Sequence, residues 1–353
     1  MSITMKDHLQ GSLLGVRIGD ALGMPVETMS PAEILAATDG KGVTGFLDAI
    51  QTKYPDQAML KKGDPTDDWQ FNRIVAKSLI ACRGYNQADM ARRHVAEKDV
   101  NMIGWGKTTR SATMELATYF ASGGQYGRDP NNLPEAKPDF GGGNGVGMKV
   151  FSLPSAILAA EYGAQYRYPE YTLFRWVEQL TMLTHSHSDA FFTAYALAVA
   201  FDACVRDAVY TSSDAQRLLQ KIDFELAKVE NASRYRDVSA TRKQIGRLMY
   251  CIGNPGKVTE NFPPYGLAIQ SVPFALGIFL TYPGDARKAL LTCVNAGYDC
   301  DTTAAMCGSL LGANGGVEAF PAEWRNFRPD FQEPLELGER LYQAFARTSQ
   351  QTS

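Results

Sequence analysis

Helical periodicity dominates this sequence and constrains its fold more than any other feature. From Phe71 to Cys82, apolar and small residues recur at the i, i+3, i+4 and i+7 spacing of one buried helix face. The alternation of apolar and polar residues that is typical of strands is scarce. The sequence therefore predicts an all-α fold, with further helices over residues 5–22, 86–97, 108–121, 169–183, 187–207, 213–230, 239–252 and 334–347.

Helix-start signals agree with this prediction. Ser30 and Glu33 form a capping box around Pro31, which stands at the first helical position, and Asp285 precedes an apolar helical run. Residues 122–143, in contrast, have no periodic apolar face, and their length indicates either a linker or a functional lid.

The first predicted helix has one glycine in every four residues, at Gly11, Gly15, Gly19 and Gly23. This spacing leaves one helix face without side chains, so that another helix can approach its backbone closely. Membrane helix dimers use the same spacing, but Arg17 and Asp20 in this helix argue against a membrane span. We therefore expect tight packing of two helices in a soluble core.

Charge and composition exclude several classes of protein. The 353 residues include 35 basic and 38 acidic side chains, which give no positive field to attract nucleic acid or an anionic membrane. The uncharged stretch 261–284 contains Pro263, Pro264 and Pro273, so we expect a buried helix there and no membrane span. Six cysteines are too few for a disulfide scaffold, and the first residues lack a signal pattern, so a cytoplasmic protein is expected.

Two acidic motifs each open a predicted helix, one at Thr66, Asp67 and Asp68 and the other at Asp299, Asp301 and Thr302. Helix capping would explain either motif alone, because threonine and aspartate accept the first N–H groups of a helix. Four carboxylates at one point would instead repel one another unless cations neutralise them. An all-oxygen ligand set favours Mg²⁺ or Mn²⁺, and four negative charges match two divalent cations.

Two further motifs allow more than one interpretation. The glycine-rich stretch 140–149 precedes an apolar helical segment and suits either a phosphate-binding loop or a plain hinge, which the sequence alone favours. His185 and His187 raise the idea of zinc, but histidines two residues apart do not share a helix face. Helix capping combined with hydrogen bonding to a ligand is the favoured interpretation of these histidines.

The remaining candidates are isolated residues. Glu27 follows the first helix at a bend that Pro25 enforces, and alone it would be a surface carboxylate. Cysteines recur every seven residues at Cys293, Cys300 and Cys307. Seven helical residues span about 10 Å, too far for one metal ion, so these cysteines are interpreted as small buried residues.

Five motifs in this order resemble those of the ADP-ribosylglycohydrolase family, which includes dinitrogenase reductase-activating glycohydrolase and the ADP-ribosyl-acceptor hydrolases. They are GDALGMPVE, DPTDDW, GGGNGVGMKV, LTHSH and GYDCDTTAAMCGSLLGANGG. The match covers almost the whole chain. The resemblance implies a compact, single-domain, orthogonal helix bundle over residues 1–353, with two divalent cations, Mg²⁺ or Mn²⁺, in a cleft that joins the acidic motifs.

The resemblance also implies residue roles, carried over position by position. The metal ligands fall on Thr66, Asp67, Asp68, Asp299, Asp301 and Thr302. The catalytic residues would be Glu27, Asp67 and Asp301, and the contacts to ADP-ribose would be Gly142, Gly143, Asn144, Gly145 and His185. Three positions depart from the family pattern: Tyr298 and Cys300 replace a glycine and a small polar residue, and Lys149 replaces the more usual arginine.

The implied activity is hydrolysis of the glycosidic bond between ADP-ribose and a protein side chain, with arginine as the first expected acceptor and serine next. The sequence leaves open a catalytically silent ADP-ribose-binding protein, or a hydrolase of another ADP-ribosylated small molecule or nucleic acid. Loops at 122–143 or at Pro263–Tyr265 are expected to recognise the acceptor. Without a heptad seam, a monomer is expected.

Overall fold

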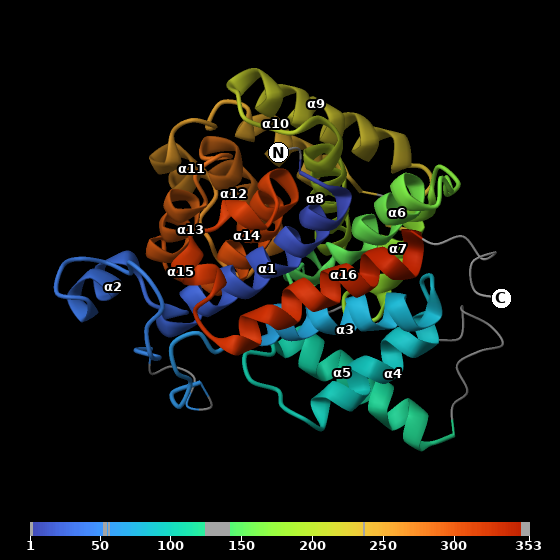
Figure 1. Ribbon diagram of the computed structural model, residues 1–353, viewed down its shortest axis with the longest axis horizontal. Coiled ribbons are helices and arrows are strands. Elements are labelled where there is room, and N and C mark those ends of the chain that lie inside the picture. Colours follow the sequence, from blue (N-terminus) through green and yellow to red (C-terminus); the bar gives the residue numbers. More distant parts are fainter. Residues whose placement is uncertain (1–2, 52–54, 56, 124–141, 236, 347–353) are drawn as a thin grey trace.

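The computed structural model describes residues 3–51, 55, 57–123, 142–235 and 237–346 (Figure 1). Within these residues the chain forms helices and no strand, apart from an isolated bridge between Gly143 and Leu267, which confirms the all-α prediction. The helices are α1 (Met5–Gly23), α2 (Pro31–Ala37), α3 (Asp67–Cys82), α4 (Gln87–Lys98), α5 (Lys107–Ala121), α6 (Ser152–Gly163), α7 (Thr172–Met182), α8 (Ser188–Asp207), α9 (Ser212–Val229), α10 (Ser239–Leu248), α11 (Pro255–Asn261), α12 (Ala268–Thr281), α13 (Ala286–Asn295), α14 (Cys300–Gly315), α15 (Ala322–Arg325) and α16 (Glu333–Ala346).

The helix starts follow the capping signals of the sequence. The Ser30 and Glu33 side chains form the expected capping box at α2, and Asp285 accepts a hydrogen bond from the Lys288 N–H at the start of α13.

Two boundaries differ by three residues or more. Helix α7 begins at Thr172 and not at residue 169, because a turn closed by the Thr172 N–H and the Pro169 carbonyl precedes it. Helix α10 ends at Leu248 and not at residue 252, because the chain turns there through two hydrogen bonds of the i to i+3 type.

Helix α1 runs through the middle of the molecule and contacts both α14 and α16 (Figure 1). A Cβ atom on Gly15 would lie 2.0 Å from the carbonyl oxygen of Gly308, and one on Gly19 would lie 2.2 Å from that of Ala304. Only glycine permits such an approach of two backbones. The expected role of the glycines in close helix packing is therefore confirmed.

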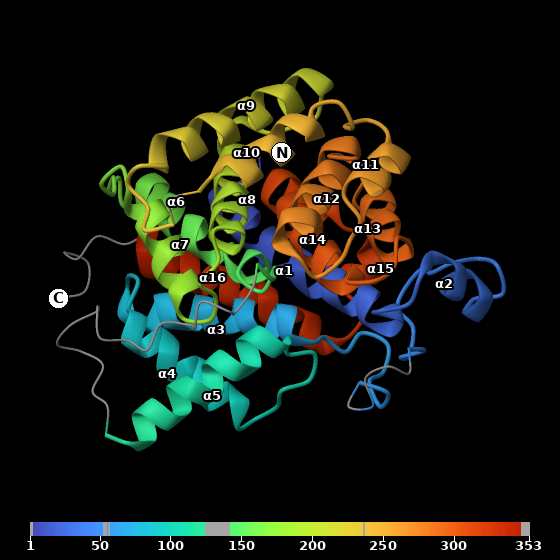
Figure 2. The same ribbon diagram turned by 180° about the vertical axis from the view of Figure 1, so that it is seen from behind.

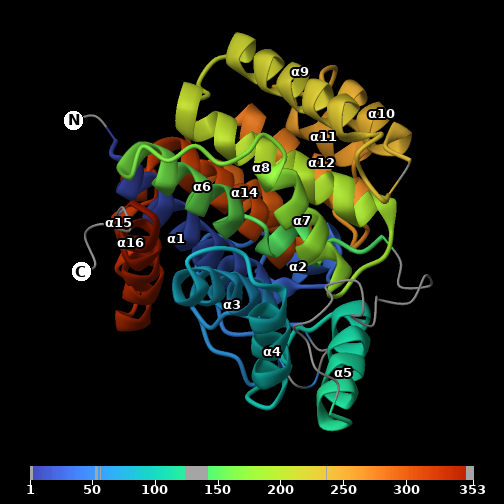
Figure 3. The same ribbon diagram turned by 90° about the vertical axis from the view of Figure 1, so that its right-hand side faces the viewer.

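The other helices form layers around the packed helices α1 and α14. Helices α3, α4 and α5 lie on one side of α1, and α9, α10 and α11 lie on the opposite side, as Figure 2 also shows from behind. Figure 3 shows the same separation from the side, with α16 and α14 flanking α1. Both α3 and α14 begin near the C-terminal end of α1, since Asp20 bonds to Thr66 and Gly23 lies against Asp301.

One described helix, α8, is long and apolar enough to cross a membrane by length and composition. It has 20 residues, more than the apolar run 190–201 alone suggests, and 78% of its most apolar window is buried inside the molecule. It packs against α6, α7, α9, α12 and α14. This burial is typical of a core helix.

The uncharged stretch 261–284 contains the buried helix α12, with Pro273 inside it, as expected.

Candidate functional site

Carboxylates from three separate segments meet where α1 ends and where α3 and α14 begin. Asp20, Asp68 and Asp301 each offer an oxygen, and these atoms lie within 4.8 Å of one another. Glu27, Asp299 and Asp301 form a second group with the same spacing. Because Asp301 belongs to both groups, the two acidic motifs form one continuous site.

Helix capping does not account for the first residue of either motif. Thr66 and Asp299 occupy the N-cap positions of α3 and α14, yet neither side chain accepts a hydrogen bond from a helix N–H. The Thr66 hydroxyl instead donates to Oδ1 of Asp20, at 2.8 Å. At these two positions the capping interpretation is wrong, and for α3 the reason is that a carboxylate from another helix takes its place.

Asp20 of α1 supplies that carboxylate, and sequence reasoning did not identify it as a site residue. It accepts hydrogen bonds from the backbone N–H groups of Thr66 and Trp69, both at 2.9 Å. Asp20 is fully buried. A charged residue in the last turn of a glycine-faced buried helix was the signal that could have revealed it.

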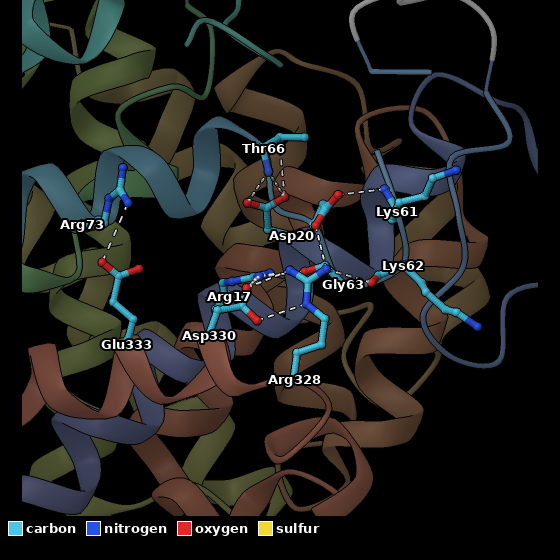
Figure 4. A network of polar contacts seen from close by, with 11 residues as sticks. Arg17, Asp20, Lys61, Lys62, Gly63, Thr66, Arg73, Arg328, Asp330 and Glu333 are labelled. Atoms are coloured by element: carbon cyan, nitrogen blue, oxygen red, sulfur yellow. Dashed lines mark hydrogen bonds and ion pairs between the residues drawn. The ribbon is translucent and has the colours of Figure 1, made fainter. Parts of the chain in front are cut away.

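Arg17, one turn before Asp20, forms hydrogen bonds both with the loop that leads into α3 and with the C-terminal part of the chain (Figure 4). Its Nη2 atom donates to the carbonyl oxygen of Gly63 at 2.6 Å and to Oδ2 of Asp330 at 2.8 Å. Arg328 pairs with Asp330 in turn, at 2.7 Å. The loop that leads into α3 is therefore held from both sides.

The acidic site has more negative charge than its hydrogen bonds satisfy. Among the described residues, Oδ1 of Asp68 and Oδ1 of Asp301 are buried and have no hydrogen-bond partner. Burial and the neighbouring carboxylates raise the pKa of both groups well above the usual range. The same causes raise the pKa of Asp67 to about 8. Orphaned carboxylate oxygens with hydroxyl neighbours fit divalent cations that prefer oxygen ligands.

Glu27 belongs to this site and is not a free surface carboxylate. It follows the 3₁₀ turn η1 (Met24–Val26), and Nε2 of Gln57 donates to its Oε2 atom at 2.8 Å. Burial, together with the charge of Asp299, raises the pKa of Glu27 to about 8. Its carboxyl group therefore retains a proton at a pH where an ordinary glutamate has lost it.

Two strained residues connect the segment of Glu27 to the segment of Asp299. Thr28 and Tyr298 have positive φ angles of 71° and 59°. Thr28 N–H donates to the Tyr298 carbonyl at 2.6 Å, and Tyr298 N–H donates to the Met29 carbonyl at 2.7 Å. Tyrosine adopts a positive φ only with strain, so the backbone at position 298 is a strained part of the site.

A cavity of about 670 Å³ opens above the acidic site. Glu27, Asp67, Asp299, Asp301 and Thr302 line one part of it, and the opposite part is lined by Gly143, Asn144, Gly145 and His185. Thr66 and Asp68 are buried beside it and are absent from its wall. Gly142, expected among the ligand contacts, lies instead against His187 and Asp189. The other expected contacts therefore face the acidic site across one cavity.

The glycine-rich loop is fixed to the rest of the molecule. Asn144 N–H donates to the Gly266 carbonyl at 3.2 Å, and Ala268 N–H donates to the Gly142 carbonyl at 2.7 Å. Nδ2 of Asn144 also donates to Oδ2 of Asp299, at 2.6 Å. These bonds do not suit a freely moving hinge, and they join the loop directly to the acidic site. Most of the expected lid at 122–143 lies outside the described residues.

His187 caps a helix and His185 lines the cavity, in agreement with the capping and ligand-binding interpretation. His187 caps α8, because its Nδ1 atom accepts the Asp189 N–H at 3.1 Å. His185 lies against Gly145, where a Cβ atom would be 3.0 Å from its ring. In the part of the chain that the structure describes, the candidate metal clusters contain carboxylates alone, which gives zinc no support.

The three cysteines with the seven-residue spacing are buried and free. Cys293 lies in α13 and Cys307 in α14, while Cys300 begins α14. Their seven-residue spacing does not follow one helix, because α13 ends at Asn295. The interpretation as small buried residues is confirmed.

Comparisons with known proteins agree on one family. The family model of the ADP-ribosylglycohydrolases matches residues 1–351. An ADP-ribosyl-[dinitrogen reductase] glycohydrolase from Rhodospirillum rubrum is 26% identical, over 91% of this chain and 90% of that protein. The ADP-ribosylhydrolase ARH3 of Gallus gallus is 22% identical, over 96% and 94%. The solved structure of an ADP-ribosylglycohydrolase-related protein complex is similar with a TM-score of 0.66, at 25% identity, covering 97% of this chain and 99% of that one.

Proposed function

Because the chain belongs to the ADP-ribosylglycohydrolase family and is an ADP-ribosyl-acceptor hydrolase, we propose that its acceptor is an arginine side chain and that it requires two divalent cations, Mg²⁺ or Mn²⁺. The reaction adds water across the glycosidic bond. The hydroxyl goes to the ribose carbon, and the proton goes to the departing guanidine nitrogen.

The cation requirement is supported by one observation above all: two buried carboxylate oxygens, on Asp68 and Asp301, have no partner among the described residues. A burial of this kind is costly unless a counter-charge is present. The residues that would hold the cations are Thr66, Asp67, Asp68, Asp299, Asp301 and Thr302. When bound, divalent cations neutralise such carboxylates and polarise the ligand oxygens that reach them.

The other residues bind and orient the substrate. The backbone at Gly143 and Gly145 is open to the cavity and suits the diphosphate, because N–H groups bind phosphate without a basic side chain. Asn144 orients Asp299 through its hydrogen bond. Glu27 would exchange one proton at its carboxyl oxygen, either with the attacking water or with the departing nitrogen.

Arginine is favoured as the acceptor by the aromatic side chains of the cavity. The rings of Tyr265 and Tyr298 line it and meet edge to face, 4.7 Å apart. A guanidinium cation is attracted by aromatic faces and stacks on them. The R. rubrum relative is named for ADP-ribosyl-[dinitrogen reductase], and serine is the second acceptor to test.

The direct test is the release of ADP-ribose from ADP-ribosyl-arginine and ADP-ribosyl-serine peptides, with Mg²⁺, Mn²⁺ or EDTA present. We expect cation-dependent release from the arginine peptide. The double variant Asp67→Ala, Asp301→Ala should lose at least about a thousandfold in kcat/KM. The exposed control Glu260→Ala should keep full activity.

Each other outcome has a defined meaning. Release from the serine peptide alone would contradict the proposed acceptor, and release in EDTA would contradict the cation requirement. Tight ADP-ribose binding without release from either peptide would indicate another ribosylated substrate or a silent binder.

The monomeric state, the single domain and the cytoplasmic location stay predictions.

A further inference from the structure

A lysine without a role in the proposed reaction is buried behind the cavity. Lys149 ends the 3₁₀ turn η3 (Gly147–Lys149) and has no exposed surface. We propose that Lys149 is a positioning residue that sets the tautomer of His185, so that Nε2 of His185 carries the hydrogen and donates it into the cavity. The identity of the ligand, ADP-ribose, rests on the proposed function, whereas the tautomer does not.

The surroundings of Lys149 restrict where its hydrogens can go. Its Nζ atom lies 3.2 Å from Oγ1 of Thr184 and 3.3 Å from Nε2 of His94. The ring of Phe71 covers it, with the ring centroid 5.0 Å away. In the described parts of the chain, no carboxylate forms a salt bridge with this lysine. Burial lowers the pKa of Lys149 to about 7, so at pH 6, the pH chosen for the experiments below, its amine is an ammonium group. An ammonium group has three hydrogens and no lone pair, so Lys149 donates to both neighbours at that pH.

His94 fixes one end of this chain of hydrogen bonds. Its Nδ1 atom lies 2.8 Å from the carbonyl oxygen of Met90. A carbonyl oxygen only accepts, so Nδ1 of His94 carries the ring hydrogen, and Nε2 is left to accept from Lys149. Burial lowers the pKa of His94 to about 3, which agrees with a neutral ring.

The hydroxyl group of Thr184 is the donor in a second hydrogen bond, to His185. Its hydroxyl oxygen lies 2.9 Å from Nδ1 of His185. The ammonium group of Lys149 cannot accept the hydroxyl hydrogen, and Nδ1 of His185 is the other hydrogen-bond partner of this hydroxyl among the described residues. The hydroxyl hydrogen therefore points to Nδ1 of His185, which is the accepting nitrogen. Burial and the charge of Lys149 lower the pKa of His185 to about 3, so the ring is neutral. Its single hydrogen is therefore on Nε2.

The Nε2 edge of His185 faces the glycine-rich loop. A Cβ atom on Gly143 or on Gly145 would lie 3.4 Å from this nitrogen, and all three residues line the cavity. An N–H at this place suits a phosphate or hydroxyl oxygen, which accepts hydrogen bonds. The opposite tautomer would present a lone pair and repel the same oxygen. Lys149 thus acts on ADP-ribose only through Thr184 and His185.

Matched variants separate this role from packing. Lys149→Met keeps the aliphatic volume and removes the donor, whereas Lys149→Arg keeps a cationic donor. Thr184→Val breaks the chain of hydrogen bonds one step later, and Thr184→Ser preserves it. If Lys149→Met fails to fold, the pair at Thr184 still decides the question.

Nitrogen-15 NMR of the histidine rings in the ligand-free full chain at pH 6 reports the tautomers directly. The sequence has four histidines, so few signals are expected, and His185→Gln assigns the relevant one. His8, whose Nδ1 lies 2.6 Å from the Ala313 carbonyl, and His94 provide internal references for the Nδ1–H form. We expect Nε2–H at His185 in the native chain and in the Arg and Ser variants, and a mixture in the Met and Val variants.

Calorimetry with ADP-ribose and Mg²⁺ at pH 6 supplies the second readout. We expect about tenfold weaker binding in Lys149→Met and Thr184→Val, corresponding to one hydrogen bond to a charged ligand, and near-native binding in the two conservative variants. Nδ1–H in the native chain, or an unchanged Nε2–H in both disruptive variants, would overturn the proposal. A mixture of tautomers in the disruptive variants with unchanged affinity would contradict the claim that the Nε2 hydrogen of His185 binds ADP-ribose. Absence of hydrolysis contradicts only the proposed function.

Discussion

The two ends of the α1–α14 pair share one seam of glycines but differ in the side chains beside it. At one end, Gly11 and Gly15 of α1 touch the backbone of Gly312 and Gly308, so the helices meet with no side chain between them. At the other end, the same two helices carry carboxylates that face one another, among them Asp20 and Asp301. The first end is fully packed, and the second has buried charge without partners.

This difference shows how a protein can hold repelling groups at fixed positions. Four carboxylates with raised pKa values oppose their own close approach, so the force that holds them must come from elsewhere. Continuous backbone contact along the glycine seam, and the Arg17 bonds to the loop before α3, provide that force. The seam is therefore expected to contribute stability, and the acidic end to reduce it until cations bind.

The largest effect is expected from the seam. In Gly15→Ala the new Cβ atom would lie 2.0 Å from the Gly308 carbonyl oxygen, so the helices must separate. We expect a loss of at least about 3 kcal/mol in the free energy of unfolding, measured with urea. The control Gly246→Ala, in α10 with no atom within 4 Å, should be neutral or gain up to about 1 kcal/mol. Equal stability of the two variants would contradict the importance of the seam.

The next effect concerns cations and pH. Asp67 and Glu27 have pKa values of about 8, so they hold protons at pH 6 that a cation must displace, and they are largely ionised at pH 8.5. Without cations, the folded chain keeps these protons after the unfolded chain has lost them, so these two groups lower stability as pH rises from about 4 to about 8. We expect Mg²⁺ or Mn²⁺ to raise the melting temperature more at pH 8.5 than at pH 6. An equal rise at both values would count against a carboxylate site.

A third prediction compares two fully buried aspartates of the acidic end. Asp68→Asn removes a buried carboxyl group whose Oδ1 atom has no partner and whose pKa folding raises, so the cation-free chain should gain about 1–2 kcal/mol at pH 8.5 and lose its response to cations. Asp20→Asn removes a carboxylate that accepts two backbone N–H groups, and should cost about 1–2 kcal/mol. Chemical denaturation in EDTA measures both. The same sign for the two variants would contradict this division of roles.

The smallest effect is expected at Tyr298, where the φ angle is 59°. Tyr298→Gly should relieve strain and gain up to about 1 kcal/mol, as should the matched Ala208→Gly at φ 49°, which lies away from the cavity. Only Tyr298→Gly should lower kcat/KM on the ADP-ribosyl-arginine peptide, because it alone removes a ring from the cavity mouth. Equal activity in both glycine variants would show that the tyrosine ring does not contact the acceptor.

Much of the fold could be predicted from the sequence because its signals are local. The apolar face of α3, the capping box at α2 and the glycine spacing of α1 each lie within a single helix, where period and side-chain chemistry determine the outcome. The meeting of the two acidic motifs is not a local signal. It was implied only by the family resemblance, and the structure places them together.

The parts that the sequence did not reveal depend on contacts between distant residues. Asp20 takes the place of a helix cap for residues 46 and 49 positions away, so no spacing within either motif identifies it. The same distance explains why helix capping stayed an alternative for Thr66 when its motif was considered alone. The bonds from Lys149 through Thr184 to His185 likewise join segments 35 positions apart.

The contact between Gly23 and Cys300 joins residues 277 positions apart. A ribosome therefore releases α1 and the first acidic motif long before α14 exists, and the nascent chain carries half of the cation ligands together with an uncovered glycine face. The acidic site cannot assemble until synthesis is nearly complete. Cation loading should thus be the last event in the maturation of this protein, and chains that stop before α14 should neither bind cations nor act on ADP-ribose.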